Sequence, residues 1–399
     1  MNAATAGGDG RAAAAPLGVY VHIPFCVRKC QYCAFNSYPV AEPAVDPLVD
    51  RYTRALLLEV ESVAALVEGD AGPRPATLYF GGGTPTCIGA SRLARVVSAC
   101  TEAFNLPDGS EVTVECNPAT VDLPGLRTLR DAGVNRLSVG AQAFQDNLLG
   151  RLGRVHTAAD VDAVVQAARS AGFANLNLDL MFGIPGQWIR EWEESLRRAV
   201  DLGPEHVSIY PLEVEEGTPL YGMVSEGSEV LPAEDEVVEM WEAALDRLAR
   251  AGYARYEISN YSKPGFESRH NLIYWLNGDY VGLGAGACSH LSGVRRQNLA
   301  GPEEYCDAVE SGLPPVVSVE RLSSRTQMVE TVIMGLRLTA GLSLEGFRSR
   351  FRCDLDDVFP GVIGKLEALG LLCRDGGAVR LTRRGLFLAN VVFREFASE

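Results

Sequence analysis

Three cysteines lie close together near the start of the chain, at Cys26, Cys30 and Cys33, with the spacing C-x₃-C-x₂-C. Zinc sites usually use four ligands, often as two cysteine pairs, and no second pair follows here. A [4Fe–4S] cluster is normally held by four cysteinates, so three would leave one iron with an open position. An open metal site can bind a substrate or cofactor directly. The spacing therefore favours an iron–sulfur cluster over a zinc site.

Further chemistry-bearing residues follow several predicted strands. The stretch YFGGGTPT brings Gly82, Gly83 and Thr84, and its glycines would let the backbone approach a ligand closely. No G-K-[S/T] follows, so a P-loop is excluded. Glu115 lies in an apolar strand and needs a partner, which a ribose diol would supply. Arg154 could bind a carboxylate through a forked, charge-assisted contact.

The cysteine motif, with Tyr32 before its last cysteine, resembles the signature of radical S-adenosylmethionine (SAM) enzymes. In that family the open iron chelates the methionine moiety of SAM, and one electron cleaves SAM to a 5′-deoxyadenosyl radical. The resemblance is to the branch containing coproporphyrinogen dehydrogenase, and it runs from about Gly18 to the C-terminus. It implies that SAM is held by Tyr20, Tyr32, Gly82, Gly83, Thr84, Glu115, Gln142, Arg154 and Asp179. His22, beside the motif, would orient it through a hydrogen bond.

Two subgroups of that branch compete. The coproporphyrinogen dehydrogenase type has the segment C-x₃-C-x₂-C-x-C and a longer N-terminal extension, whereas HemW-type heme chaperones have Phe at the last position and a short N-terminus. Here Phe35 occupies that position, and only 25 residues precede Cys26. Both features favour the chaperone subgroup.

The stretch RHNLIYW fits the H-N-x-x-Y-W pattern of the chaperone subgroup, which is associated with heme. It makes His270, Asn271, Tyr274 and Trp275 the heme candidates. An imidazole can bind iron, and aromatic rings offer flat apolar faces to a macrocycle. Two alternatives stay open: a histidine satisfied within the core, or one that positions a loop over the cluster.

Six short apolar runs alternate with amphipathic helical patterns over the first two-thirds of the chain. This alternation predicts an α/β fold with a parallel sheet and right-handed crossovers. Polar or glycine-rich motifs at the ends of nearly all the strands favour a partial (β/α)₆ barrel of the TIM type over an open doubly wound sheet. The predicted strands span 18–25, 76–82, 111–118, 135–142, 175–185 and 206–214.

The chain divides into four predicted segments. These are a disordered leader (1–17), the radical SAM barrel (18–252), an aromatic and glycine-rich segment that closes the barrel (253–318), and a mainly helical domain (319–399). A helix followed by a strand–turn–strand around Gly376 and Gly377 makes the last domain resemble a winged helix.

Composition excludes several function classes. The formal net charge of −15 argues against a protein that grips nucleic-acid phosphates or adheres tightly to an anionic membrane. No apolar run reaches the length of about 18–20 residues needed to span a bilayer. The first residues, rich in alanine and glycine, lack the apolar core of a secretory signal, so a cytoplasmic protein is expected.

The sequence therefore predicts a protein that binds a [4Fe–4S] cluster, SAM and heme and delivers heme to an acceptor protein. The alternative is an oxidoreductase that decarboxylates coproporphyrinogen III to protoporphyrinogen IX with SAM. Whether the protein is an enzyme stays open, as do its oligomeric state and the identity of its acceptor and electron donor. A membrane-bound acceptor would require peripheral contact with the membrane.

Overall fold

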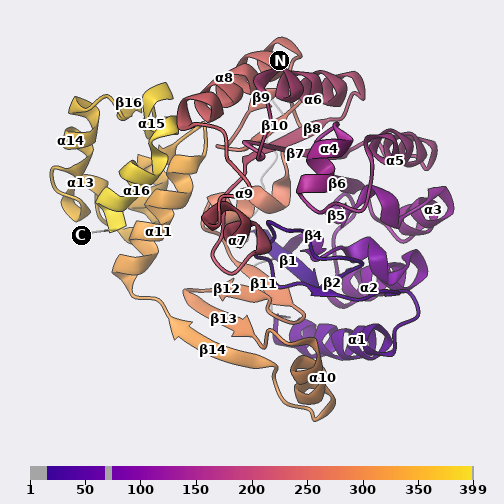
Figure 1. The fold of residues 1–399 in the computed structure, drawn as a ribbon. Coiled ribbons are helices and arrows are strands. Elements are labelled where there is room, and N and C mark those ends of the chain that lie inside the picture. The colour runs from indigo at the N-terminus through magenta and orange to yellow at the C-terminus, as the bar shows by residue number, and fades with distance from the viewer. Residues whose placement is uncertain (1–15, 68–73, 398–399) are drawn as a thin grey trace, which may run out of the picture.

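The computed structural model describes residues 16–67 and 74–397, and a curved mixed sheet dominates it (Figure 1). The strand order is β14-β13-β12-β11-β1-β4-β5-β6-β7-β8-β10-β9. The six predicted strands form its central run, all parallel. They are β1 (Pro16–Ile23), β4 (Arg74–Gly82), β5 (Glu111–Cys116), β6 (Arg136–Gln142), β7 (Leu176–Phe182) and β8 (His206–Pro211).

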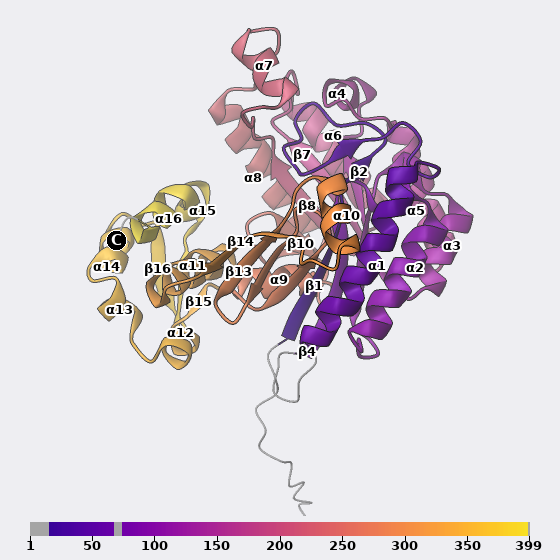
Figure 2. The same ribbon diagram turned by 90° about the horizontal axis from the view of Figure 1, so that it is seen from below.

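Helices cover the outer face of this run (Figures 1 and 2). The amphipathic patterns between and after the predicted strands, at 46–69, 91–104, 123–132, 159–171, 189–202 and 233–251, predict six of them. These helices are α1 (Pro47–Val67), α2 (Ala90–Ala103), α3 (Leu123–Asp131), α5 (Ala158–Ser170), α6 (Ile189–Asp201) and α8 (Glu234–Arg250). Short helices α4 (Asp146–Arg151) and α7 (Pro219–Ser225) lie at the strand ends. Because β1 and β8 pair with other strands and not with each other, the barrel is partial, as predicted.

The two-residue period of the strands separates apolar from polar side chains. On β6, Leu137 and Val139 are fully buried in the core beneath the helices, whereas Ser138 and Gln142 line a central cavity. On β7, Leu178 and Leu180 belong to the same core, while Asp179 faces the cavity. The barrel therefore has a dry outer layer and a polar interior.

The segment after α8 extends the sheet at both edges. At the β8 edge it adds antiparallel β10 (Asn260–Ser262) and β9 (Ala254–Arg255). It then crosses to the β1 edge through α9 (Arg269–Trp275), which packs against β1 and β4. There it adds β11 (Tyr280–Leu283) parallel to β1. Next come β12 (Cys288–Leu291), β13 (Val294–Asn298), α10 (Pro302–Glu310) and β14 (Val316–Arg321).

A smaller, mainly helical unit with its own apolar core follows, drawn in yellow and light orange in Figure 1. Its elements are α11 (Ser324–Arg337), β15 (Leu342–Ser343), α12 (Leu344–Phe351), α13 (Leu355–Val358), α14 (Val362–Ala368), β16 (Leu372–Asp375), β17 (Ala378–Leu381), α15 (Arg383–Phe387) and α16 (Ala389–Ala397). The β16–β17 hairpin turns at Gly376 and Gly377, which gives the predicted winged-helix character. The unit touches the barrel where the Trp241 ring of α8 meets Phe387, 4.9 Å between centroids.

Two predicted segment boundaries fall inside strands. Pro16 and Leu17, assigned to the leader, begin β1, and the rest of the leader lies outside the described residues. β14 crosses the boundary set at 318/319, because this strand pairs with β13 of the main sheet. The division into domains otherwise stays a prediction. No helix within residues 16–67 and 74–397 is long and apolar enough to cross a membrane.

Candidate functional site

The cysteine motif lies on a loop that leaves the carboxyl end of β1, which we call the cluster loop (residues 26–37). The short strands β2 (Phe25–Cys26) and β3 (Tyr38–Pro39) pair with each other and close the base of this loop. Asn36 Nδ2 donates to the carbonyls of Ala285 (3.1 Å), in the loop after β11, and Ala300 (3.0 Å), in the loop after β13. The loop is therefore held in shape at both ends.

None of the three cysteines forms a disulfide, and all three are partly exposed and line one cavity. Burial raises the pKa of the Cys26 thiol, so its thiolate requires a nearby positive charge such as iron. Each cysteine of a [4Fe–4S] cluster binds a different iron, so its ligands do not converge on one ion. Within the described residues, no group of three or more His, Cys, Asp or Glu side chains is placed to hold a single metal ion.

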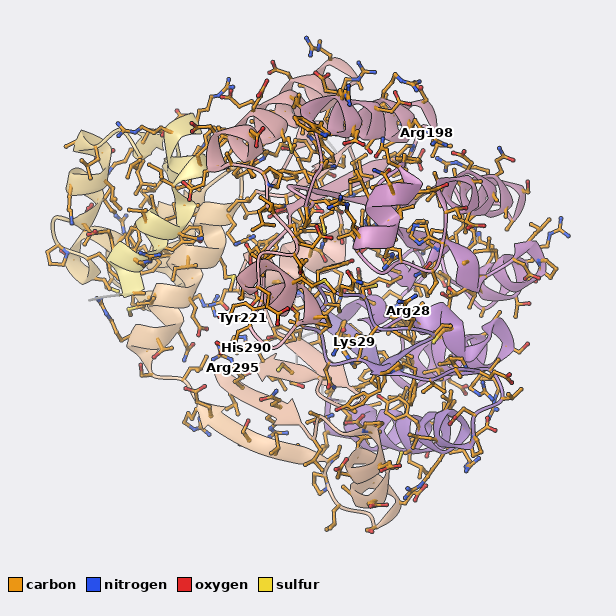
Figure 3. All side chains as sticks on the ribbon, in the orientation of Figure 1. Arg28, Lys29, Arg198, Tyr221, His290 and Arg295 are labelled. Atoms are coloured by element: carbon orange, nitrogen blue, oxygen red, sulfur yellow. The ribbon has the colours of Figure 1, made fainter. Side chains whose placement is uncertain are left out.

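Phe35 stands where a fourth cysteine would follow, and its ring is 69% exposed at the cavity mouth. A phenyl ring cannot ligate iron, so the protein offers no cysteine at that position. Arg28 and Lys29 of the same loop also line the mouth and are labelled in Figure 3. Lys29 Nζ donates to the Phe35 carbonyl at 3.3 Å, which ties the two halves of the cluster loop together.

The glycine loop, residues 82–84 at the end of β4, lies directly against the cluster loop. Gly83 N donates to the Ile23 carbonyl (2.9 Å) and Thr84 N to the Phe25 carbonyl (2.8 Å). A Cβ on Gly83 would lie 2.6 Å from the Phe25 carbonyl oxygen and 3.0 Å from Cys26 Sγ. This approach explains why glycine is required there, and it forms a backbone cradle beside the first cysteine.

Glu115, on β5, lines the cavity and is partly buried. The Tyr79 hydroxyl donates to its Oε1 at 2.7 Å. Burial is the main reason that the Glu115 pKa rises from its ordinary value of 4.5 to about 7. A carboxylate that titrates near neutrality in a cavity is suited to accept hydrogen bonds from a bound polar ligand.

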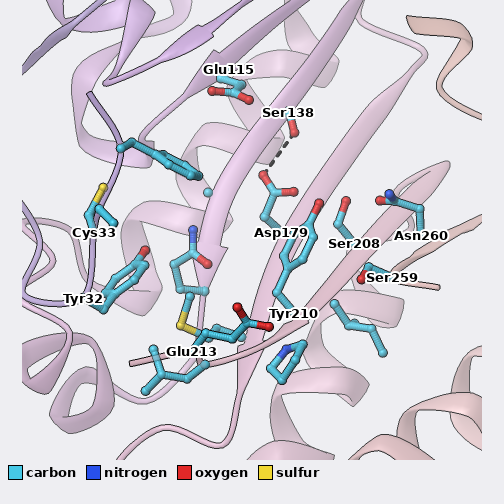
Figure 4. A pocket seen from close by; sticks show the side chains of 18 of the residues that line it. Tyr32, Cys33, Glu115, Ser138, Asp179, Ser208, Tyr210, Glu213, Ser259 and Asn260 are labelled. Atoms are coloured by element: carbon cyan, nitrogen blue, oxygen red, sulfur yellow. Dashed lines mark hydrogen bonds between the residues drawn. The ribbon is translucent and has the colours of Figure 1, made fainter. Parts of the chain in front are cut away.

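Asp179, on β7, is another carboxylate that lines the cavity and is partly buried (Figure 4). Ser138 Oγ donates to its Oδ2 at 3.0 Å and Asn177 Nδ2 to its Oδ1 at 2.8 Å. Burial raises the Asp179 pKa, while these donors act in the opposite direction. The side chain is therefore fixed in orientation before any ligand binds.

Gln142 and Arg154 complete the wall next to the cluster loop. Gln142 has φ of +63°, a left-handed conformation that is uncommon for a non-glycine residue and is often found at functional sites. Arg154 Nη2 donates to the Gly140 carbonyl (2.8 Å), and Nη1 donates to Cys30 Sγ (3.5 Å). Its Nε is buried without a partner among the described residues. Arg154 therefore links β6 to the cluster loop and keeps a donor for a ligand.

One cavity of about 770 Å³ brings most of the predicted site together, a volume typical of small-molecule sites. The predicted residues that line it are Cys26, Cys30, Cys33, Tyr32, Gly82, Gly83, Thr84, Glu115, Gln142, Arg154, Asp179, Asn271, Tyr274 and Trp275. Tyr20 and His270 are not among its lining residues.

Tyr20 instead lies behind the cavity wall. Its hydroxyl is hydrogen-bonded to His22 Nδ1 (2.9 Å), and His22 Nε2 donates to the Asn36 carbonyl (2.8 Å). The Tyr20 ring stacks on the Tyr79 ring, with centroids 6.2 Å apart. Tyr20 thus supports the cluster loop through His22, which gives His22 the orienting contact expected from the sequence.

His270 is buried, with only 1% of its surface exposed. Its Nδ1 is hydrogen-bonded to Thr77 Oγ1 and its Nε2 to the Tyr274 hydroxyl, both at 2.8 Å. Burial lowers its pKa to about 3, so the ring is neutral. To bind iron, His270 would have to give up one of these hydrogen bonds. The contacts match the alternative of a satisfied core histidine.

Several residues that line the cavity belong to none of the motifs found in the sequence. Tyr79, Arg136, Ser138, Ser208, Tyr210 and Arg337 all line the cavity. Three of them alternate with apolar neighbours on the same strands as predicted site residues: Tyr79 on β4, and Arg136 and Ser138 on β6. Extending the two-residue period back from Gln142 would have placed Ser138 and Arg136 on the inner face. The same step back from the predicted Gly82 reaches Phe80, which is fully buried in the core, so Tyr79 could not be found in this way.

Comparison with known proteins identifies two segments. Residues 20–199 match the Radical SAM superfamily, and residues 322–388 match the HemN C-terminal domain. The heme chaperone HemW of Bacillus subtilis is 38% identical, over 95% of this chain and 99% of the relative. Heme chaperone HemW of Mycobacterium tuberculosis H37Rv is 37% identical, over 95% and 94% respectively.

The fold also resembles a solved structure, that of coproporphyrinogen III oxidase (HemN) from Escherichia coli. The TM-score is 0.82 at 24% identity, covering 97% of this chain and 91% of the other. This likeness confirms the α/β radical SAM fold with its C-terminal helical domain. Together with the near full-length relatives, it shows that the chain belongs to the HemW family within the radical SAM superfamily, whose cofactors are a [4Fe–4S] cluster and SAM.

Proposed function

We propose that this protein binds heme and delivers it to an acceptor protein. The observation that carries the proposal is the 38% identity to a heme chaperone over nearly the full length of both chains. Phe35, at the position where the dehydrogenase type has a fourth cysteine, supports the same choice.

In this proposal Cys26, Cys30 and Cys33 hold the cluster. When bound, the cluster supplies an open iron for the methionine end of SAM. The chain's own residues position that cofactor. The glycine loop offers backbone groups, Glu115 offers a carboxylate to the ribose, and Arg154 offers its unpartnered Nε to the SAM carboxylate. Tyr32, Gln142 and Asp179 complete the SAM wall.

Heme would occupy the side of the cavity formed by α9. Asn271, Tyr274 and Trp275 face that side and are the proposed heme contacts. His270 supports Tyr274 through its hydrogen bond, and this contact positions the Tyr274 ring. The acceptor, the electron donor and a cytoplasmic location belong to the proposal as well. If the acceptor is bound to a membrane, this protein would contact it at the membrane surface.

The test is a heme titration of anaerobically purified, cluster-loaded protein, followed by mixing with a heme-free acceptor. A stoichiometric heme spectrum that moves to the acceptor would support the proposal. Failure to bind heme, or binding without transfer to any heme-free acceptor offered, would refute it. The Tyr274→Ala variant should weaken heme binding, and Tyr221→Ala, on α7 and absent from the cavity lining, serves as the matched control.

A further inference from the structure

The far end of the cavity lies between the barrel and the C-terminal unit. Its walls come from Trp241 on α8, Trp275 on α9, and Phe387 and Phe393 on α15 and α16. Arg337, the last residue of α11, also faces this end. Aromatic side chains and a guanidinium therefore share this end of the cavity.

Arg337 stacks on an aromatic ring but is left without a close polar partner. Its guanidinium carbon lies 4.5 Å from the centroid of the Trp275 ring. Its only ion pair among the described residues is with Glu257 Oε2 at 3.9 Å, which is beyond hydrogen-bond distance. Its Nε is buried and has no hydrogen-bond partner there. A donor in this state lacks the acceptor that buried polar groups normally have.

Two further polar atoms at this end are also unpartnered. Glu257 is fully buried, and its Oε1 accepts hydrogen bonds from Ser259 N (2.8 Å) and Asn260 Nδ2 (2.6 Å). Its Oε2 accepts none within the described residues, and Trp275 Nε1 is likewise buried without an acceptor. Leaving a buried polar group unpaired is unfavourable, because the group has lost its hydrogen bonds to water. Three in one place indicate a missing polar ligand group.

The positions of these groups are fixed by the backbone. Glu257 and Leu338 form an isolated antiparallel bridge, so the end of α11 is tied to the loop after β9. Thr339 N donates to the Tyr256 carbonyl at 2.9 Å and strengthens the tie. Arg337 and Glu257 are therefore preorganised on two elements that belong to different units of the fold.

We propose that Arg337 binds a carboxylate side chain of the tetrapyrrole, with the macrocycle against the aromatic walls formed by Trp241 and Phe387. This inference rests on the proposed heme function and deepens it. A guanidinium whose Nε is unpartnered suits a carboxylate, and charge-assisted contacts of this kind are short and strong. Trp275 Nε1 offers a second donor.

Glu257 would oppose a carboxylate if it were ionised. Burial, the largest cause, raises the pKa of Glu257, so protonating it beside a ligand carboxylate costs less than it would in water, and the protonated form donates a hydrogen bond. A protonated Oε2 would then be a further donor to the ligand. The competing interpretation is that Arg337 and Glu257 are a loose structural ion pair that never meets a ligand.

The experiment compares the binding of heme with that of heme dimethyl ester, in the same detergent, because the ester lacks the carboxylates. Cluster-loaded wild-type protein should bind heme at least about tenfold more tightly than the ester. Arg337→Met should reduce this preference to about one, and Arg337→Lys should retain part of it. Arg325→Met is the matched control, since Arg325 lies on the same helix, stacks on Phe359 at 4.3 Å and is absent from the cavity lining.

The outcomes separate the two proposals. Equal binding of heme and ester by the wild type would overturn the role of Arg337 and leave heme binding standing. Retention of the preference in Arg337→Met would do the same. If neither compound binds the wild-type protein, the proposed function fails and this inference fails with it. Should Arg337→Met not fold, Arg337→Lys takes its place, and an undiminished preference for heme in that variant would overturn the role of Arg337.

Discussion

The protonation state of Glu115 should control SAM binding. This carboxyl lines the cavity and accepts a hydrogen bond from the Tyr79 hydroxyl at 2.7 Å. Burial raises its pKa to about 7. If its carboxylate accepts hydrogen bonds from the ribose, only the ionised form binds SAM well. Acidification across neutrality should therefore weaken SAM binding, because protonation removes an acceptor.

The pKa sets the size of the effect. With a value of about 7, roughly one-tenth of Glu115 is ionised at pH 6 and roughly nine-tenths at pH 8. The apparent Kd for SAM should consequently be about tenfold higher at pH 6 than at pH 8. The contribution of Glu115 to the free energy of unfolding depends on pH in the opposite direction, because it falls as the pH rises. A carboxyl whose pKa is raised on folding contributes most below its ordinary value of 4.5, and that contribution is lost as the pH rises to about 7.

Equilibrium dialysis of SAM against cluster-loaded protein from pH 6 to pH 8 measures this dependence. The Glu115→Gln variant keeps an oxygen for Tyr79 but cannot ionise, so it should bind SAM more weakly and with no such pH dependence. Its free energy of unfolding at pH 8 without SAM should exceed that of the wild type, because a buried charge is removed. A flat wild-type curve, or the same slope in Glu115→Gln, would refute the reasoning.

Two further predictions concern the close contact of Gly83 and the buried hydrogen bonds of His270. Gly83→Ala should weaken cluster and SAM retention by about 1–3 kcal/mol, because its Cβ would lie 2.6 Å from the Phe25 carbonyl oxygen; iron content and SAM Kd measure this. Gly150→Ala, which meets nothing within 4 Å, is its control, and an equal loss in both variants would argue against the cradle. His270→Ala should lower the free energy of unfolding by about 1–3 kcal/mol, since the hydroxyls of Thr77 and Tyr274 lose a buried partner. Denaturant unfolding tests it, and an altered heme spectrum at unchanged stability would instead support iron ligation.

The parallel core of the fold could be predicted because each unit is local in sequence. The run 176–182, for example, alternates Leu176, Leu178 and Leu180 with polar residues, and the next helix begins a few residues later. The edge strands could not be predicted in the same way. β11 has four residues and pairs in parallel with β1, about 260 residues earlier in the chain. Such pairing depends on tertiary packing that short strands do not encode.

The site residues also fall into those that a local motif reveals and those that only tertiary packing places. The cysteines and the glycine loop carry spacing constraints that a sequence displays directly. By contrast, the sequence does not show whether Tyr20 or Tyr79 lines the cavity, because this depends on how the two neighbouring rings stack. In the structure Tyr79 lines the cavity and Tyr20 does not. The pattern around His270 predicted a heme contact, but its depth beneath the surface follows from packing of α9 on β1 and β4. Arg337 lies far along the chain from every motif.

Whether the chain carries heme or decarboxylates coproporphyrinogen III can be decided in one anaerobic reaction. Cluster-loaded protein is supplied with SAM, a reductant and coproporphyrinogen III, and protoporphyrinogen IX is quantified against a sample without SAM. A heme carrier should give no SAM-dependent product while the same preparation binds heme stoichiometrically. SAM-dependent formation of protoporphyrinogen IX over many turnovers would contradict the chaperone function.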